Sequence, residues 1–105
     1  MTVLFHPDFP RDIRKFEQDY QAISDGLAAR FRREIDDGIE AIKHSPQSAG
    51  HFLQTGSGVV TAFRRRNLRA FPFFILYGIA EEAVIVGSLI PSRTDPLTWL
   101  TRFEE

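Results

Sequence analysis

The sequence predicts an α+β fold, in which an antiparallel sheet of about four strands carries a hairpin of two α-helices on one face. One observation is the segment Phe71–Ile79, whose alternate positions are apolar on both sides of an extended chain. Such a strand needs cover on both faces and is placed in the middle of the sheet. Two further observations predict this fold: a second apolar segment, Ala83–Ile90, and two helical patterns between residues 9 and 44. The expected order is β-α-α-β-β-β-α, ending in a short C-terminal helix.

The length and composition indicate one soluble domain. The chain has 105 residues, which is enough for one core, so we expect a single domain over residues 1–105. There is no cysteine, which excludes disulfides and thiol chemistry. No basic leader or long apolar run is present, so we expect a cytoplasmic protein with no membrane partner. The net charge of −1 argues against a strong non-specific nucleic-acid binder.

The N-terminal part predicts a strand followed by a helix. The run Thr2–Phe5 is β-prone, and the pair His6-Pro7 ends it. A helix is expected to begin near Asp8-Phe9-Pro10, because proline is favoured in a first helical turn. Its apolar stripe recurs at spacings of three and four residues and consists of Phe9, Ile13, Phe16, Tyr20 and Ile23.

A second helix follows, capped by Ser24 or Asp25. It ends at His44-Ser45-Pro46, because the residue before a proline avoids the helical region. The two helices form a hairpin whose apolar side needs a flat partner, and the sheet is expected to supply it. The stripe of this second helix is Leu27, Phe31, Ile35, Ile39 and Ile42.

The C-terminal half predicts the remaining strands. Residues 47–58 contain several glycines and serines and indicate a loop. A strand begins at Val59–Phe63 and continues into an arginine run, and Ala80-Glu81-Glu82 turns the chain between the two apolar strands. After a turn at Pro91–Thr94, Asp95-Pro96 is expected to begin the terminal helix, which carries Trp99 and Phe103.

The residues outside the arginine run do not form a recognisable catalytic or metal site. His6, His44 and His51 stand in separate regions without a second ligand at suitable spacing. There is no phosphate-binding glycine loop and no nucleophile motif, and we expect no cofactor. The arginines themselves have two interpretations. They form either a solvated rim that pairs with Glu81, Glu82 or the acidic C-terminus, or a surface that binds phosphate or carboxylate.

One pattern is fairly specific in combination. An arginine-rich strand leads into Phe71-Pro72-Phe73-Phe74-Ile75-Leu76-Tyr77, and an acidic turn and an apolar strand lead into Arg93-Thr94-Asp95-Pro96-Leu97-Thr98-Trp99. This pattern, together with His6-Pro7 and the helix hairpin, resembles the RelE/ParE toxins of bacterial type II toxin–antitoxin modules. The resemblance covers nearly the whole chain.

The resemblance implies a toxin that a co-expressed antitoxin neutralises. RelE-like members cleave mRNA on the ribosome, whereas ParE-like members poison DNA gyrase without being nucleases. The nuclease site uses an arginine three residues before the strand's tyrosine, where this chain has Phe74. It also uses a C-terminal acid–base residue, for which the nearest residues here are Trp99 and Phe103. Many relatives carry a histidine two residues before the retained Arg93, where this chain has Pro91.

These departures favour a ParE-like toxin that acts by binding gyrase and is not an enzyme. The alternatives are an mRNA interferase that acts on the ribosome and a degenerate toxin that binds only its antitoxin. An apolar groove is expected on the sheet face that the hairpin leaves open, and it would bind the antitoxin. The candidate antitoxin-binding residues are Phe73, Phe74, Leu76, Ile85 and Trp99.

Among the arginines, Arg93 is expected to contribute most to target binding. Three adjacent arginines on a strand alternate between faces, so they cannot all face one target. Arg93 instead lies on a turn that Pro91 and Asp95-Pro96 stiffen. The alternative is that Arg93 makes a surface ion pair with Asp95 or Glu104. The further candidate target-binding residues are Arg64, Arg65, Arg66 and Arg69.

Overall fold

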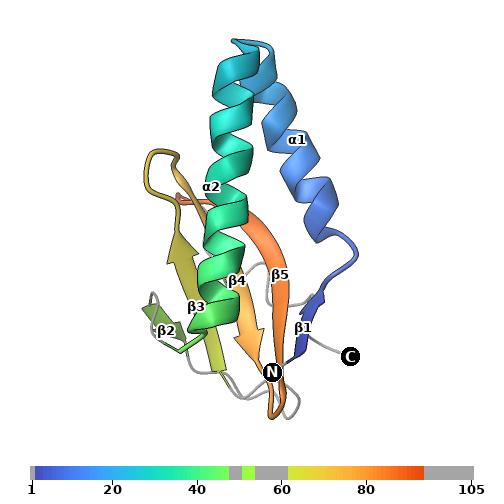
Figure 1. The fold of residues 1–105 in the computed structure, drawn as a ribbon, viewed down its shortest axis with the longest axis vertical. Helices are drawn as coiled ribbons and strands as arrows, with labels where there is room; N and C mark the ends of the chain where they lie inside the picture. The colour runs from blue at the N-terminus through green and yellow to red at the C-terminus, as the bar shows by residue number, and fades with distance from the viewer. Residues whose placement is uncertain (1, 48–50, 54–61, 94–105) are drawn as a thin grey trace.

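The structure is a computed structural model that describes residues 2–47, 51–53 and 62–93. A helix hairpin packs against one face of a five-stranded sheet, as Figure 1 shows, and the predicted α+β class is confirmed. The strand order across the sheet is β1-β5-β4-β3-β2. The elements are β1 (Thr2–Phe5), α1 (Phe9–Gln21), α2 (Asp25–His44), β2 (His51–Leu53), β3 (Ala62–Asn67), β4 (Phe73–Ile79) and β5 (Ala83–Pro91).

The sheet differs from the prediction at its two edges. β1 pairs in parallel with β5, from Thr2 opposite Ala83 to Phe5 opposite Val86, so the sheet is mixed rather than wholly antiparallel. Parallel neighbours need a long crossover connection, and here that connection contains the helix hairpin. At the other edge, β2 pairs with β3 inside the segment 47–58 that was expected to be only loop. The predicted strand start at 59–61 and the predicted terminal helix at 95–103 lie outside the described residues.

β4 is the central strand, and its side chains alternate between two hydrophobic clusters, one on each face of the sheet. Ile75 and Tyr77 pack with the helices, whereas Phe74 and Leu76 pack with Phe63 on the other side. All seven residues of β4 are buried, and the strand lies in the middle of the sheet as predicted. The strand begins at Phe73, two residues later than expected, because the chain turns tightly at 68–73. In that turn the Phe73 N–H donates to the carbonyl of Phe71 at 2.8 Å.

Helix α2 begins at a capped N-terminus and lies directly on the central strand. The Ser24 hydroxyl accepts a hydrogen bond from the Leu27 N–H at 3.0 Å, which decides between the two predicted caps. Gly38 is buried in the middle of the helix, and a Cβ atom there would lie 3.0 Å from Cδ1 of Ile75. This glycine therefore permits the close approach of α2 to β4.

Gly38→Val is expected to lower the free energy of unfolding by about 1–3 kcal/mol, since added carbon atoms would overpack the contact with Ile75. The matched control is Gly26→Val in the first turn of α2, where nothing lies within 4 Å of the added Cβ position. Urea denaturation of both variants checks the prediction. Equal stabilities would show that the helix can move away from β4 without cost.

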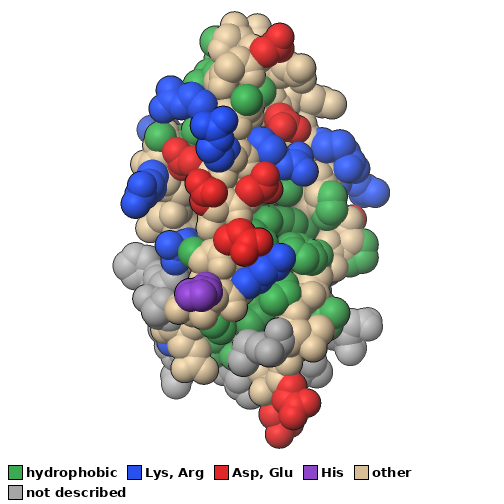
Figure 2. Space-filling model, in the orientation of Figure 1, with side chains coloured by type: hydrophobic (Ala, Val, Ile, Leu, Met, Phe, Trp, Pro, Cys, Tyr) green, Lys and Arg blue, Asp and Glu red, His purple; other side chains and the backbone are tan. Residues whose placement is uncertain are grey.

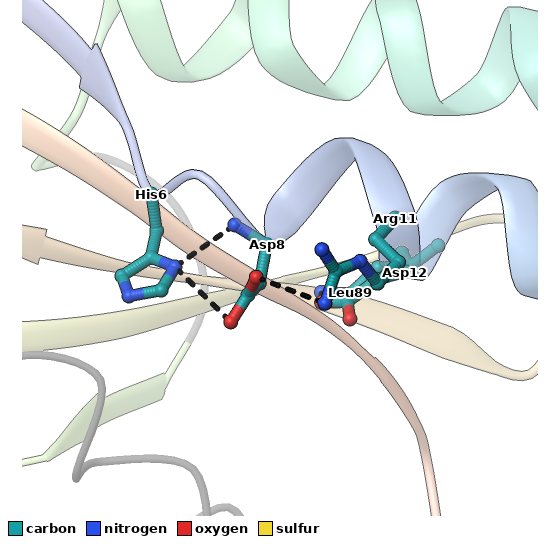
Figure 3. A network of polar contacts seen from close by, with 5 residues as sticks. All are labelled: His6, Asp8, Arg11, Asp12 and Leu89. Atoms are coloured by element: carbon teal, nitrogen blue, oxygen red, sulfur yellow. Dashed lines mark hydrogen bonds and ion pairs between the residues drawn. The ribbon is translucent and has the colours of Figure 1, made fainter.

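Helix α1 is tied to the sheet by a polar network at its start (Figure 3). The imidazole Nδ1 of His6 accepts a hydrogen bond from the Asp8 N–H at 3.1 Å, and the Asp8 carboxylate lies 3.6 Å from Arg11 Nη1. One turn on, the buried Asp12 carboxylate accepts a hydrogen bond from the Leu89 N–H at 3.1 Å. The described pairing with β1 ends at Val86, so β5 extends past it, and Asp12 satisfies the Leu89 N–H in this extension.

Within the described residues, no helix is long and apolar enough to cross a membrane.

Candidate functional site

The three adjacent arginines of β3 alternate between the two faces of the sheet. Arg64 lies opposite Tyr77 and Arg66 opposite Ile75, so both belong to the face that carries the helices. Arg65 lies opposite Leu76 and belongs to the other face. Directly paired residues share a face, so this register follows from strand geometry. The arginine run therefore supplies two separate surfaces and not one patch.

On the face away from the helices, the Arg65 guanidinium is held in a fixed orientation. Its Cζ lies 4.0 Å from the centroid of the Phe74 ring, which is within cation–π distance. Its Nε and Nη2 donate to the Asn67 side-chain oxygen at 3.3 and 3.1 Å. Because a guanidinium has five N–H donors, the remaining ones can still bind an anion. Asn67 was missed from the sequence, although a residue two positions along a strand lies on the same face.

On the helix face, Arg64 and Arg66 flank a buried tyrosine. The Tyr77 hydroxyl donates to the carbonyl of Pro46 at 2.6 Å, and its side chain is fully buried. Burial raises the pKa of the Tyr77 hydroxyl, and the two arginines partly oppose this by favouring the phenolate. Tyr77 is therefore a neutral structural contact at pH 7.

Tyr77→Phe is expected to lower the free energy of unfolding at pH 7 by about 0.5–1.5 kcal/mol, because the bond to Pro46 is lost. The difference from the wild type should shrink as the pH rises above about 10, the range in which an unfolded tyrosine ionises. A raised folded-state pKa means that the unfolded chain loses its proton first, so the wild type loses this contribution with rising pH. Urea titrations between pH 7 and 11 check this, and a constant difference would contradict it.

The other two candidate arginines lie at one end of the sheet. Asn67 at the end of β3 lies opposite Phe74, and Pro91 at the end of β5 lies opposite Phe73. The exposed Arg69 and Arg93 follow these two strand ends, so the fold brings them to the same end of the molecule. The turn that carries Arg93 is anchored by the Ser92 N–H, which donates to the carbonyl of Pro72 at 2.9 Å.

The acidic residues of the β4–β5 turn lie at the opposite end of the sheet. Arg66 lies opposite Ile75, and β4 continues from there to Ile79 before the turn at Glu81 and Glu82. Figure 2 shows acidic side chains at this lower end of the molecule. Over the part of the chain that the structure describes, Arg65, Arg66, Arg69 and Arg93 form no ion pair with an acid. The ion pairs described there lie in the N-terminal and helical segments.

Most of the candidate antitoxin-binding residues are buried, whereas the sequence predicted that they line an exposed groove. Phe74 and Leu76 have no exposed surface, and Phe73 is 7% exposed on the helix side of the core. Only Ile85 is partly exposed, and Trp99 lies outside the described residues. The alternation of a strand places residues on faces but does not say how far each face is covered. Contact of these residues with an antitoxin stays a prediction.

Of the remaining titratable groups, Glu34 of α2 contacts the segment that carries Arg69, whereas no described contact joins His6 or His44 to the candidate arginines. His6 lies between β1 and α1, and His44 is exposed at the end of α2. No group of three potential metal ligands is found among the described residues.

Glu34 of α2 was missed from the sequence: its carboxylate accepts hydrogen bonds from the N–H groups of Arg69 and Ala70 at 2.8 to 3.2 Å. No sequence signal links residues so far apart.

Comparison with known proteins finds a match to the fold. A solved structure described as "Chromosomal ParDE TA system from P. aeruginosa" contains a chain with a TM-score of 0.67 to this one. The match covers 87% of this chain and 95% of that chain at 14% sequence identity. The fold is ParE-like. No protein-family model and no curated protein matches the sequence.

Proposed function

We propose that this chain is the toxin of a bacterial type II toxin–antitoxin module, that a cognate antitoxin neutralises it in the cytoplasm, and that it arrests growth by binding DNA gyrase. The observation that carries the proposal is the ParE-like fold, which extends over 87% of the chain. The exposed arginines at one end of the sheet give this fold a surface for an acidic target. Their guanidinium groups suit carboxylates and phosphates because they donate in a planar fork.

The described side chains support binding rather than catalysis. Phe74 occupies the strand position where the resemblance implies an arginine in the nuclease members, and it is fully buried. The Tyr77 hydroxyl is buried and donates to Pro46, so it is not placed to transfer a proton to a substrate. Arginines can stabilise developing negative charge, but they cannot serve as general bases at pH 7.

The antitoxin is proposed to use the sheet face opposite the helices near β1. Ile85 is partly exposed on this face, and Leu4, its partner in the parallel register, is 51% exposed. β1 is also an edge strand, so its outer side can accept an added segment of a partner.

Expression in a bacterial host, with and without the product of the neighbouring gene, tests the proposal. We expect growth arrest that the neighbouring product relieves, inhibition of supercoiling by purified gyrase, and intact transcripts. Discrete cuts in mRNA on the ribosome would assign the chain to the nuclease class instead. Binding to the neighbouring product without any arrest would indicate a degenerate toxin.

A further inference from the structure

A small polar cleft lies between helix α2 and the end of β3. Its volume is about 250 Å³. One wall is helical and acidic, whereas the other comes from β3 and the segment after it and carries two arginines. The lining residues are Glu34, Asp37, Gly38, Arg66, Asn67, Leu68 and Arg69. Figure 2 shows the mixed acidic and basic side chains that lie along α2.

The charged groups of the cleft differ in the hydrogen bonds and ion pairs that they form. The Glu34 carboxylate accepts hydrogen bonds from the N–H groups of Arg69 and Ala70, with oxygen–nitrogen distances of 2.8, 3.1 and 3.2 Å. Those bonds fix the segment that carries Arg69 against the helix. Arg66 and Arg69 form no ion pair with an acid in the described ranges 2–47 and 62–93, so their guanidinium donors can receive an anion.

The size of the cleft limits what can enter it. A helix is about 10–12 Å wide and cannot enter such a space. A single side chain can enter, if the segment that carries it lies across the opening.

We propose that the cleft receives a carboxylate side chain of the antitoxin named in the proposed function, from a segment other than the one placed on the opposite face near β1. A carboxylate matches the planar forks of Arg66 and Arg69. A nucleic acid is disfavoured, because it brings a charge at every phosphate and Glu34 and Asp37 would repel the run of charges. Asp37 is the one carboxylate of the cleft without a described hydrogen bond or ion pair, and it repels the incoming group toward the basic wall.

This arrangement predicts the direction in which four substitutions change the affinity for the antitoxin. Arg66→Gln and Arg69→Gln should each weaken the purified complex with the neighbouring gene's product by roughly tenfold, since each removes a charge-assisted hydrogen bond. Asp37→Asn should tighten the complex by several-fold, because it removes a repulsion. Arg69→Lys keeps the charge but not the fork and should weaken the complex less than Arg69→Gln.

The matched control is Arg32→Gln on the surface of α2 outside the cleft, where Arg32 already pairs with Glu17 and Asp36. Dissociation constants are measured by calorimetry, and thermal unfolding confirms that each variant is folded. Unchanged binding in all cleft variants would overturn the cleft proposal and leave the proposed function standing. Tighter binding of the arginine variants with weaker binding of Asp37→Asn would show a cation in the cleft and also overturn it. If the wild-type chain forms no complex, both proposals fail.

Discussion

Arg93→Ala is expected to abolish the growth arrest proposed for this chain and to leave its fold intact. Arg93 is exposed in the turn that ends β5, and in the described part of the chain it forms no ion pair with an acid. The turn is held by the bond from the Ser92 N–H to Pro72, and Pro91 restricts its backbone. A stiff turn lowers the backbone entropy that is lost when its guanidinium binds a target. Growth curves after induction and circular dichroism of the purified variant check both parts.

The matched control is Arg65→Ala, which removes the same side chain from the middle of β3. The Arg65 guanidinium is already engaged by Asn67 and by the Phe74 ring, so we expect a smaller loss of arrest. Arg93→Ala should also bind the neighbouring gene's product as tightly as the wild type. A fully toxic Arg93→Ala variant, beside a harmless Arg65→Ala variant, would reverse the assignment of the main target-binding residue.

The largest loss of stability is expected from Phe31→Ala. Phe31 is fully buried, and its ring centroid lies 4.8 to 5.2 Å from those of Tyr20, Phe71 and Phe73. Truncating a buried phenylalanine costs about 3–5 kcal/mol through lost transfer free energy and a residual cavity. A small domain has about 5–15 kcal/mol of total stability, so this variant should be largely unfolded in moderate urea.

The control for Phe31→Ala is Ile23→Ala at the turn between the helices. Ile23 is 73% exposed, and its truncation should change the free energy of unfolding by less than about 0.5 kcal/mol. Both variants are compared by urea denaturation at pH 7. A loss below about 1 kcal/mol for Phe31→Ala would mean that the helix hairpin contributes little to the stability of the sheet.

The sequence by itself determined the elements that local periodicity encodes. The alternation in Phe71–Ile79 placed β4 in the middle of the sheet, and the Phe31 stripe of α2 predicted its packing on the sheet. Pro46 marked the end of α2, and Ser24 or Asp25 its start, between which the structure selects Ser24. The alternation of the arginines along β3 also followed from the period of a strand. Each of these depends on neighbours within a few residues, which is the range over which backbone geometry repeats.

The tertiary structure alone decided which distant residues meet. The parallel pairing of Thr2 with Ala83 and the bonds from Arg69 and Ala70 to Glu34 join segments with no shared local pattern. The burial of Phe74 was also outside the reach of the sequence, because alternation assigns a face but not its cover. The cleft beside Arg66 exists only because α2 and the end of β3 lie close together. Long-range register is fixed by the packing of the whole core, and short windows of sequence do not contain it.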